Sequence, residues 1–188
     1  MMLVLALFAV SGCDRQKPEP QQGEATATRP AAAKSGIDRS HSGQAMPQAV
    51  FRDPDGEEVA LKEFVGRPLL LNLWASWCAP CIKELPTLDA LAVEAGAPRV
   101  LTVSQDMAPQ GSVVAFLEAH KLARLEAWHD PEMALSGEIG VQIMPTTILY
   151  DADGKEVWRY VGDLDWQSTK AKALLGEAET DSNRAAVR

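Results

Sequence analysis

Histidine and cysteine are scarce in this chain, which has three residues of each among 188. The histidines are His41, His120 and His129, and they show none of the spacings found among zinc ligands. Only Cys13 lies apart from the close pair of cysteines at positions 78 and 81. A structural zinc ion normally takes four protein ligands, so the sequence disfavours a zinc site, and we expect no bound metal.

Basic residues are also fewer than acidic ones. The 18 lysines and arginines are outnumbered by 26 aspartates and glutamates, which gives a formal net charge of −8. Nucleic-acid binding requires basic patches that neutralise phosphates, so this balance argues against DNA or RNA as a partner. The sequence also lacks a glycine-rich phosphate loop and an internal repeat. These absences disfavour a nucleotide-binding site of that kind and a repeat architecture.

The first twelve residues have the character of an export signal. The apolar run from Met1 to Val10 is too short to span a bilayer as a helix, although no basic residue precedes it. Val10-Ser11-Gly12-Cys13 resembles a bacterial lipobox, which predicts that residues 1–12 are removed and that Cys13 carries lipid. An ordinary exported protein cleaved nearby is the alternative. Asp14 resembles the signal that retains lipoproteins in the inner membrane, so we expect the periplasmic face of that membrane.

A polar, proline- and glycine-containing stretch follows the expected lipid anchor. Residues 13–45 have no hydrophobic period to bury, which predicts a disordered tether with an average reach of roughly 30 Å. Residues 46–176 have the length of one ordinary domain, and residues 177–188 are predicted to be a flexible tail. Nothing in the sequence demands more than a monomer.

The expected domain alternates strands and helices. Its pattern predicts an α/β fold with a central mixed sheet flanked by helices and with a β-hairpin at the N-terminal end. Strands are predicted at 48–52, 58–61, 68–74, 99–104, 146–150 and 156–160. Helices are predicted at 78–94, 110–120, 132–139 and 165–175, the last of them capped by Asp165.

The segment with the most specific chemistry is Trp74-Ala75-Ser76-Trp77-Cys78-Ala79-Pro80-Cys81. Two cysteines separated by two residues can form and reopen a small disulfide ring. The first lies where a helix is predicted to begin, and unpaired N–H groups and the helix dipole there favour its thiolate. The sequence thus predicts that Cys78 attacks a disulfide and that Cys81 resolves the mixed intermediate. A purely structural disulfide is the alternative, although a loop this short stabilises little.

These motifs resemble the TlpA/ResA-like branch of the thioredoxin superfamily, a group of tethered extracytoplasmic thiol–disulfide oxidoreductases. The resemblance covers about 125 residues, from Gln48 to Leu175. It is carried by the segment from Leu71 to Cys81 and by Ile143-Met144-Pro145-Thr146-Thr147, which is followed by Asp151-Ala152-Asp153-Gly154. The resemblance implies a thioredoxin-like fold and a protein-disulfide reductase that needs no cofactor.

The resemblance also implies roles for individual residues around the cysteines. Pro145 matches the cis-proline that faces the cysteine pair, and it would expose the main chain of Met144 to an extended partner segment. Trp77 would form part of the exposed apolar docking surface, whereas Trp74 would pack in the core. The expected client-binding residues are Trp77, Ala79, Pro80, Met144 and Thr146.

Glu84 is the acidic residue for which we expect a catalytic role. A helix places it one turn beyond Cys81, and in ResA-like relatives a glutamate at the matching position influences the acid–base chemistry of the site. Cytosolic thioredoxins have a buried aspartate where this chain has Asn72, which cannot take a proton. The alternative is that Glu84 is merely a solvated helix residue. The pair Gln105-Asp106 is predicted to be a loop rather than a catalytic pair.

The leading hypothesis is a membrane-tethered reductant of disulfides in exported client proteins, such as apocytochrome c or the copper-site proteins of cytochrome oxidase. In the family, a membrane reductase of the DsbD or CcdA kind regenerates the dithiol.

Two other hypotheses remain open at this stage. The chain could be an oxidant that introduces disulfides, although Ala79-Pro80 lacks the histidine of strong oxidants. It could instead be a non-catalytic module that binds copper or a partner, for which His129-Asp130 supplies the one candidate ligand.

Overall fold

The most apolar run of the expected domain forms the centre of the sheet. In the computed structural model, which describes residues 35–177, strand β4 (Leu69–Trp74) is buried at all six positions. A strand buried on both faces has no need for polar alternation, so this run can be continuously apolar apart from Asn72. The expected signal peptide, the lipid-anchor Cys13 and residues 178–188 of the expected tail lie outside the described residues.

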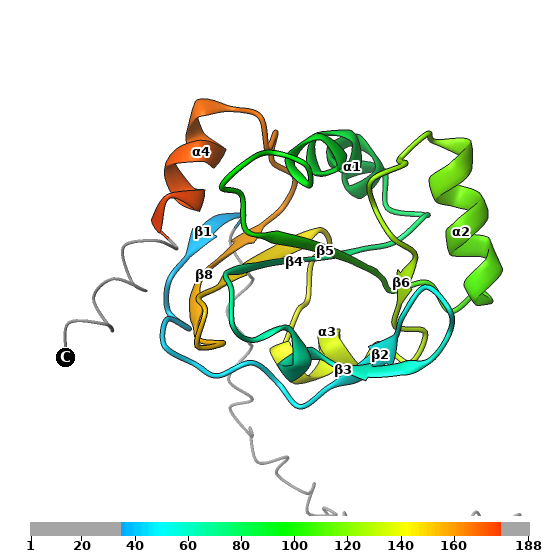
Figure 1. Cartoon of the computed structure of the whole chain (residues 1–188), viewed down its shortest axis with the longest axis horizontal. Helices are drawn as coiled ribbons and strands as arrows, with labels where there is room; N and C mark the ends of the chain where they lie inside the picture. Colours follow the sequence, from blue (N-terminus) through cyan, green and yellow to red (C-terminus); the bar gives the residue numbers. More distant parts are fainter. Residues whose placement is uncertain (1–34, 178–188) are drawn as a thin grey trace, which may run out of the picture. The chain divides into compact units, whose positions relative to one another are not determined.

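Within the described range, β4 belongs to a mixed eight-stranded sheet with the order β1-β8-β7-β4-β5-β6-β2-β3 (Figure 1). Strands β4, β5 and β6 run parallel to one another, and the other neighbours are antiparallel. The remaining strands are β1 (Gly36–Asp38), β2 (Val50–Arg52), β3 (Glu58–Ala60), β5 (Arg99–Ser104), β6 (Trp128–His129), β7 (Thr146–Tyr150) and β8 (Glu156–Val161). The predicted mixed sheet and its N-terminal hairpin, β2–β3, are therefore confirmed.

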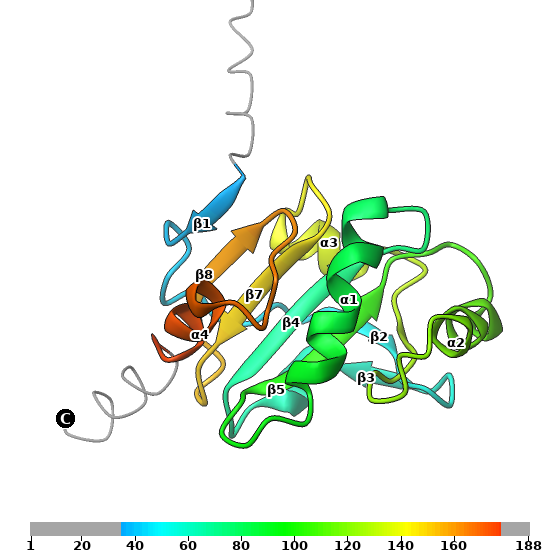
Figure 2. The same ribbon diagram turned by 90° about the horizontal axis from the view of Figure 1, so that it is seen from above.

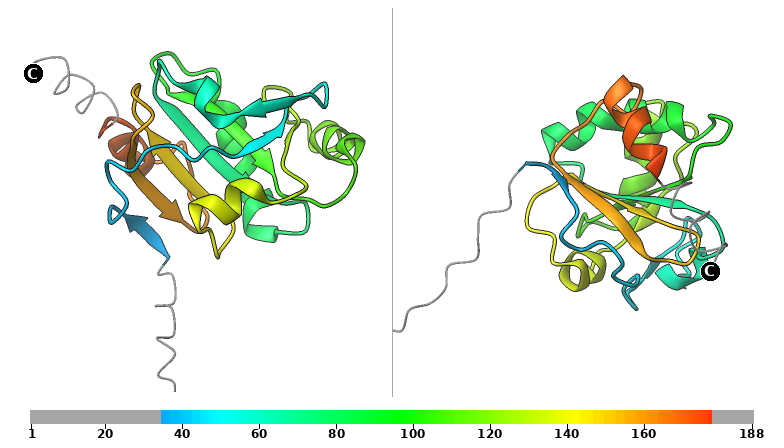
Figure 3. Two further views of the ribbon diagram at one scale, coloured as in Figure 1. Left: turned by 90° about the horizontal axis from the view of Figure 1, so that it is seen from below. Right: turned by 90° about the vertical axis from the view of Figure 1, so that its left-hand side faces the viewer.

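Helices cover both faces of this sheet. On one face lie α1 (Ala79–Leu91), α2 (Gln110–Ala119) and α4 (Thr169–Leu175), and Figure 2 shows α1 between the other two. On the opposite face lie α3 (Ala134–Ile139) and the short 3-10 helix η1 (Leu61–Phe64), next to the β2–β3 hairpin (Figure 3). The four predicted helices are all present. No helix among residues 35–177 is both long enough and apolar enough to span a membrane.

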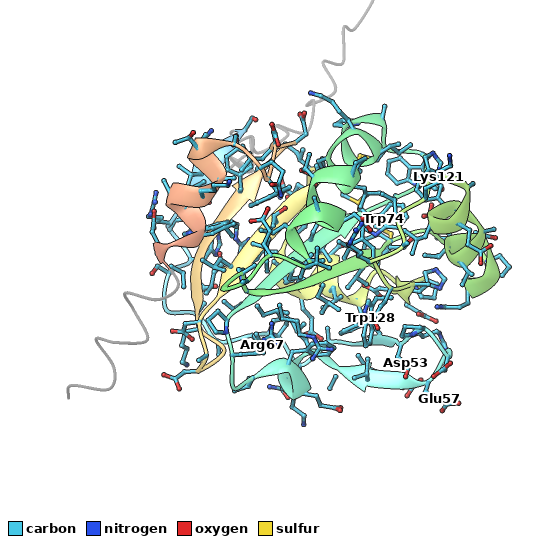
Figure 4. The ribbon with its side chains drawn as sticks, turned by 45° about the horizontal axis from the view of Figure 1, so that its top comes forward. Asp53, Glu57, Arg67, Trp74, Lys121 and Trp128 are labelled. Carbon is cyan, nitrogen blue, oxygen red and sulfur yellow. A yellow bond between two sulfur atoms is a disulfide. The ribbon has the colours of Figure 1, made fainter. Side chains whose placement is uncertain are left out.

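Each face of the sheet has its own hydrophobic core. Alternate residues of β4 point to opposite sides, so Leu70 and Trp74 pack under α1, whereas Leu71 packs against η1 and α3. Trp74 and Trp128 accordingly lie on opposite sides of the sheet (Figure 4). The prediction that Trp74 packs in the core is confirmed, with 1% of its surface exposed.

The structure differs from the sequence prediction at two ends of the domain. Strand β1 lies within residues 13–45, which the sequence predicts to be a tether, so regular structure is present about ten residues before the predicted start of the domain. Its pairing with β8 uses backbone hydrogen bonds, which leave no hydrophobic period in the sequence. Helix α4 begins after Ser168, whose hydroxyl caps it by accepting the N–H of Ala171, and Asp165 instead closes the preceding turn.

Candidate active site

The two cysteines lie at the start of α1, directly after the central strand. Cys78 is the N-cap residue, and its sulfur accepts the backbone N–H of Cys81 at 3.3 Å. The pair forms a disulfide with its Cα atoms 5.3 Å apart. Of the two side chains only Cys78 reaches the surface, with 6% of its area exposed against 0% for Cys81. Because the helix N-terminus places N–H groups against Cys78, the site is built to favour a thiolate there.

A tight turn presents the residue before this pair to solvent. The backbone N–H of Cys78 donates to the carbonyl of Ala75 at 3.1 Å, so Ser76 and Trp77 occupy the two central positions of the turn. Trp77 is 68% exposed, a large exposure for a side chain with so much apolar area. Its predicted location on the surface is therefore confirmed. Ala79 and Pro80 are exposed as well.

The loop before β7 lies beside the end of β4. Thr146 pairs with Leu73, which brings Pro145 to the edge of the sheet where the cysteine turn begins. The peptide bond between Met144 and Pro145 is cis, as the resemblance implied. Thr146 is buried, and its hydroxyl donates to the carbonyl of Ile143. Its side chain thus holds the loop together and does not face a client, in contrast to the expectation for this residue.

Glu84 is buried behind the cysteines, with only 2% of its surface exposed. Its Oε1 accepts the side-chain amide of Asn72 at 2.7 Å, and its Oε2 accepts the backbone N–H of Leu164 at 3.0 Å and the indole N–H of Trp166 at 3.3 Å. Burial raises the pKa of Glu84 to about 7, although the three hydrogen bonds oppose that rise. The structure excludes the alternative of a solvated helix residue.

Asn72 links this carboxylate to the neighbouring strand. Its amide nitrogen donates both to Glu84 and to the hydroxyl of Thr147, at 2.7 and 2.9 Å, whereas its Oδ1 has no hydrogen-bond partner among the described residues. An amide carries no titrating proton, so Glu84, on α1, is the titratable group of this hydrogen-bond network. The arrangement can therefore hold or release one proton close to neutral pH.

A second carboxylate near the cysteines, that of Asp106, is buried, although the sequence does not indicate this. Gln105 and Asp106 lie in a loop as predicted, but they are only 1% and 6% exposed. The Asp106 carboxylate accepts the N–H and the hydroxyl of Ser76, at 2.9 and 2.8 Å, and the hydroxyl of Ser104 at 2.7 Å. Consecutive polar residues at the end of a strand give no signal of such burial, because Ser76, which supplies two of these hydrogen bonds, lies 30 positions away.

The candidate copper ligand lies in the same network. Both ring nitrogens of His129 have partners, Nδ1 at 3.0 Å from Gln110 Oε1 and Nε2 at 2.7 Å from the Asp106 carbonyl oxygen. Asp130 accepts the backbone N–H groups of Ala134 and Leu135 and so holds the start of α3. In residues 35–177 no three side chains of the metal-binding types form a cluster. His129 therefore serves the packing of the sheet edge, and no observation favours the copper-binding hypothesis.

Comparison with known proteins agrees with this geometry. The Redoxin family model matches residues 41–175. The thiol-disulfide oxidoreductase ResA of Bacillus thuringiensis is 30% identical over 122 residues, which are 64% of this chain and 70% of ResA. The thiol:disulfide interchange protein DsbE of Xylella fastidiosa is 30% identical over 118 residues, which are 62% of this chain and 58% of DsbE.

Solved structures show the same fold. The exposed lipoprotein thioredoxin Etrx1 of Streptococcus pneumoniae aligns with a TM-score of 0.58 at 27% identity, over 71% of this chain and 99% of Etrx1. StoA of Bacillus subtilis aligns with a TM-score of 0.53 at 25% identity, over 70% of this chain and 98% of StoA.

The matches therefore confirm a thioredoxin-like fold, and together with the paired cysteines they establish the activity of a thiol–disulfide oxidoreductase. On this evidence the chain belongs to the Redoxin family and to the TlpA/ResA-like thiol–disulfide oxidoreductases of the thioredoxin superfamily.

Proposed function

We propose that this oxidoreductase works as a membrane-tethered reductant of disulfides in exported client proteins. The observation that carries the proposal is the asymmetry of the cysteine pair. Cys78 reaches the surface at the helix N-terminus, whereas Cys81 is fully buried one turn before Glu84, whose pKa is about 7. An attacking thiolate that reaches the surface, a buried resolving thiol and an acid that titrates near neutrality are the parts that disulfide reduction requires.

The reaction begins from the dithiol form. The thiolate of Cys78 attacks one sulfur of a client disulfide, which forms a mixed disulfide and releases the other client sulfur as a thiolate. Cys81 then loses its proton towards Glu84 and attacks the sulfur of Cys78. The client's second sulfur leaves and takes up a proton, and the enzyme retains the disulfide that the structure contains. Two electrons pass from enzyme to client, so a dithiol donor must reduce the enzyme again.

Electrostatics favour the reducing direction over the oxidising one. A strong oxidant owes its potential to a stabilised thiolate in its reduced form. Here the residues between the cysteines are Ala79 and Pro80, which supply no positive charge, and the ionised form of Glu84 adds a buried negative charge. A nearby negative charge disfavours a thiolate and thus favours the disulfide form of the enzyme. The protein would give up electrons readily.

Location and clients belong to the same proposal. The lipobox-like Cys13 and the polar residues that follow it would anchor the domain on the periplasmic face of the inner membrane. This placement would allow a DsbD- or CcdA-like membrane reductase to regenerate the dithiol. The name of one similar protein, an exposed lipoprotein thioredoxin, agrees with an extracytoplasmic location. Exported apoproteins with oxidised cysteines, apocytochrome c among them, are the clients that we propose.

The equilibrium reduction potential of the cysteine pair tests the direction. The protein is equilibrated with a dithiothreitol series, and the fractions of dithiol and disulfide are measured by alkylation and mass spectrometry. A value of about −250 mV or lower would support the reductant, whereas a value near −120 mV would support an oxidant.

Membrane tethering has a separate test. On cell fractionation, we expect the unmodified full chain in the membrane fraction and its Cys13→Ser variant in the soluble fraction. Retention of this variant in the membrane fraction would contradict lipid anchoring at Cys13.

A further inference from the structure

Three large apolar side chains stand exposed at one edge of the sheet, around the cysteine pair. Trp77 follows β4, Met107 follows β5 and Ile143 precedes β7, and they are 68%, 83% and 40% exposed. The strand order β7-β4-β5 and the pairings of Leu73 with Thr146 and of Trp74 with Ser104 bring these three loops together in that order. We call Ile143, Trp77 and Met107 the apolar row.

A clamp between the loops that follow β4 and β5 fixes one side of this row. Asp106 accepts both the backbone N–H and the hydroxyl of Ser76, and it also accepts the hydroxyl of Ser104. The next residue after each half of the clamp is an exposed apolar one, Trp77 after Ser76 and Met107 after Asp106. Charge-assisted hydrogen bonds to a buried carboxylate are strong, so the two loops cannot separate freely.

A hollow lies beyond Met107, on the side away from Trp77. Its volume is about 430 Å³, and its lining includes the apolar residues Met107, Pro109 and Pro131 together with Arg52 and His129. This space can take one large side chain. Methionine adapts its shape to different partners, which suits it to the wall of such a hollow.

We propose that Asp106, through Ser76, positions Trp77 and Met107 as a docking surface for a large apolar side chain next to the reacting cysteine of the client. This inference rests on the proposed function, since the occupant is the client segment whose disulfide meets Cys78. Trp77 directly precedes Cys78, whose sulfur the client segment must reach, and this proximity selects the client over a second copy of the chain. Asp106 acts as a positioning residue, and Met107 determines specificity.

The dimensions of the sheet indicate how far the apolar residue lies from the client cysteine. Neighbouring strands are about 4.8 Å apart, and an extended chain advances about 3.3 Å per residue. A client segment that crosses the strand ends, with its cysteine at Cys78, therefore reaches Met107 with a residue one or two positions away. The surface favours clients with leucine, methionine or an aromatic residue at those positions.

Peptide disulfides of two kinds test the inference. Each peptide contains one cysteine as a mixed disulfide with glutathione, flanked on both sides by two leucines in one peptide and by two serines in the other. The reduced protein converts either peptide disulfide into two thiols while its own cysteines form their disulfide. We expect a second-order rate constant about tenfold higher for the leucine peptide. Oxidised glutathione, which has no apolar flanks, serves as the reference substrate.

Four variants locate the source of the preference. Met107→Gln and Ser76→Ala should lower the leucine preference, measured as the ratio of the two peptide rate constants in each variant, to about twofold or less. Ser76→Thr retains both hydrogen-bonding groups of the clamp and should retain the preference. Val93→Gln alters a residue that is 63% exposed beyond the far end of α1, and it should change nothing.

Each outcome has a distinct meaning. Equal rates for the two peptides in the unmodified protein, or an unchanged preference in Met107→Gln, would overturn the docking surface and leave the reductase intact. If Met107→Gln loses the leucine preference but Ser76→Ala keeps it, the role of the clamp would be overturned. If the protein reduces neither of the two peptide disulfides nor oxidised glutathione, the proposed function would be overturned, and the docking surface with it.

Discussion

The carboxylate of Glu84 accepts a hydrogen bond from the side-chain amide of Asn72 at 2.7 Å, and both residues are buried in the core. Asn72 belongs to the central strand and Glu84 to the helix that begins with the cysteine pair. The amide does not titrate, so it holds the carboxylate in place by donating a hydrogen bond and does not exchange a proton with it. The contact therefore joins the sheet to the acid–base group of the site.

This burial makes stability depend on pH. The pKa of Glu84 rises from its ordinary value of 4.5 to about 7 on folding, so between these values the unfolded chain loses a proton that the folded protein retains. The free energy of unfolding should therefore fall as pH rises, by about 2 to 3 kcal/mol between pH 5 and pH 8 on account of this group. Urea unfolding across this range measures it. Glu84→Gln should flatten the dependence, whereas Glu94→Gln, at an exposed position, should keep it.

The same carboxylate should shape the pH profile of catalysis. Resolution of the mixed disulfide requires Cys81 to lose its proton, and ionised Glu84 can accept it. The rate of resolution should therefore rise through pH 7. At pH 8, Glu84→Gln should slow this step by about a hundredfold and remove the inflection. Near pH 5.5 the two proteins should react at similar rates, because Glu84 is protonated there. Stopped-flow tryptophan fluorescence measures the step, and an inflection that persists in the variant would contradict the role.

The different exposures of the two cysteines predict different trapped intermediates. Cys78 reaches the surface and Cys81 does not. Cys81→Ser should accumulate a mixed disulfide with a client peptide, since nothing resolves it, whereas Cys78→Ser should accumulate almost none. Non-reducing electrophoresis with mass spectrometry identifies the bonded cysteine. Equal trapping by both variants would be incompatible with the proposed order of attack.

A buried ion pair supports the loop that carries the cis-proline. Arg159 forms two hydrogen bonds to the Glu156 carboxylate, both at 2.7 Å, and a third to the carbonyl of Ile139 at the end of α3. The side chains of Arg159 and Glu156 are only 8% and 3% exposed. Arg159→Met leaves Glu156 buried and unpaired, so we expect a loss of about 3 to 5 kcal/mol in the free energy of unfolding.

The double variant Arg159→Met with Glu156→Leu provides the control. It removes both charges, so most of the stability lost in the single variant should return. Urea unfolding of the two single variants and the double variant closes the cycle. Additive losses would show that the two residues do not act as a pair.

Local patterns predicted most of the fold. The apolar run at 69–74, the hairpin turn at Asp151–Gly154 and the apolar faces of the helices depend on residues close in sequence, and the corresponding elements are present. Strand β1 escaped prediction because it is three residues long and is held by backbone pairing with β8, 120 or more positions away. The cap of α4 was misplaced because Asp165 and Ser168 are both good capping residues.

For the active site, the amino-acid sequence by itself determined the cysteine pair, the exposed tryptophan before it and the proline opposite, because spacing and motif suffice for these. Only the tertiary structure decided the chemistry of the carboxylates. Glu84 becomes an acid with a pKa of about 7 because the folded core buries it, although hydrogen bonds from Asn72, Leu164 and Trp166, which lie 12 to 82 positions away, oppose that rise. Asp106 reaches Ser76 across 30 positions. Burial and partners of this kind are properties of the folded core, since desolvation depends on everything that packs around a group.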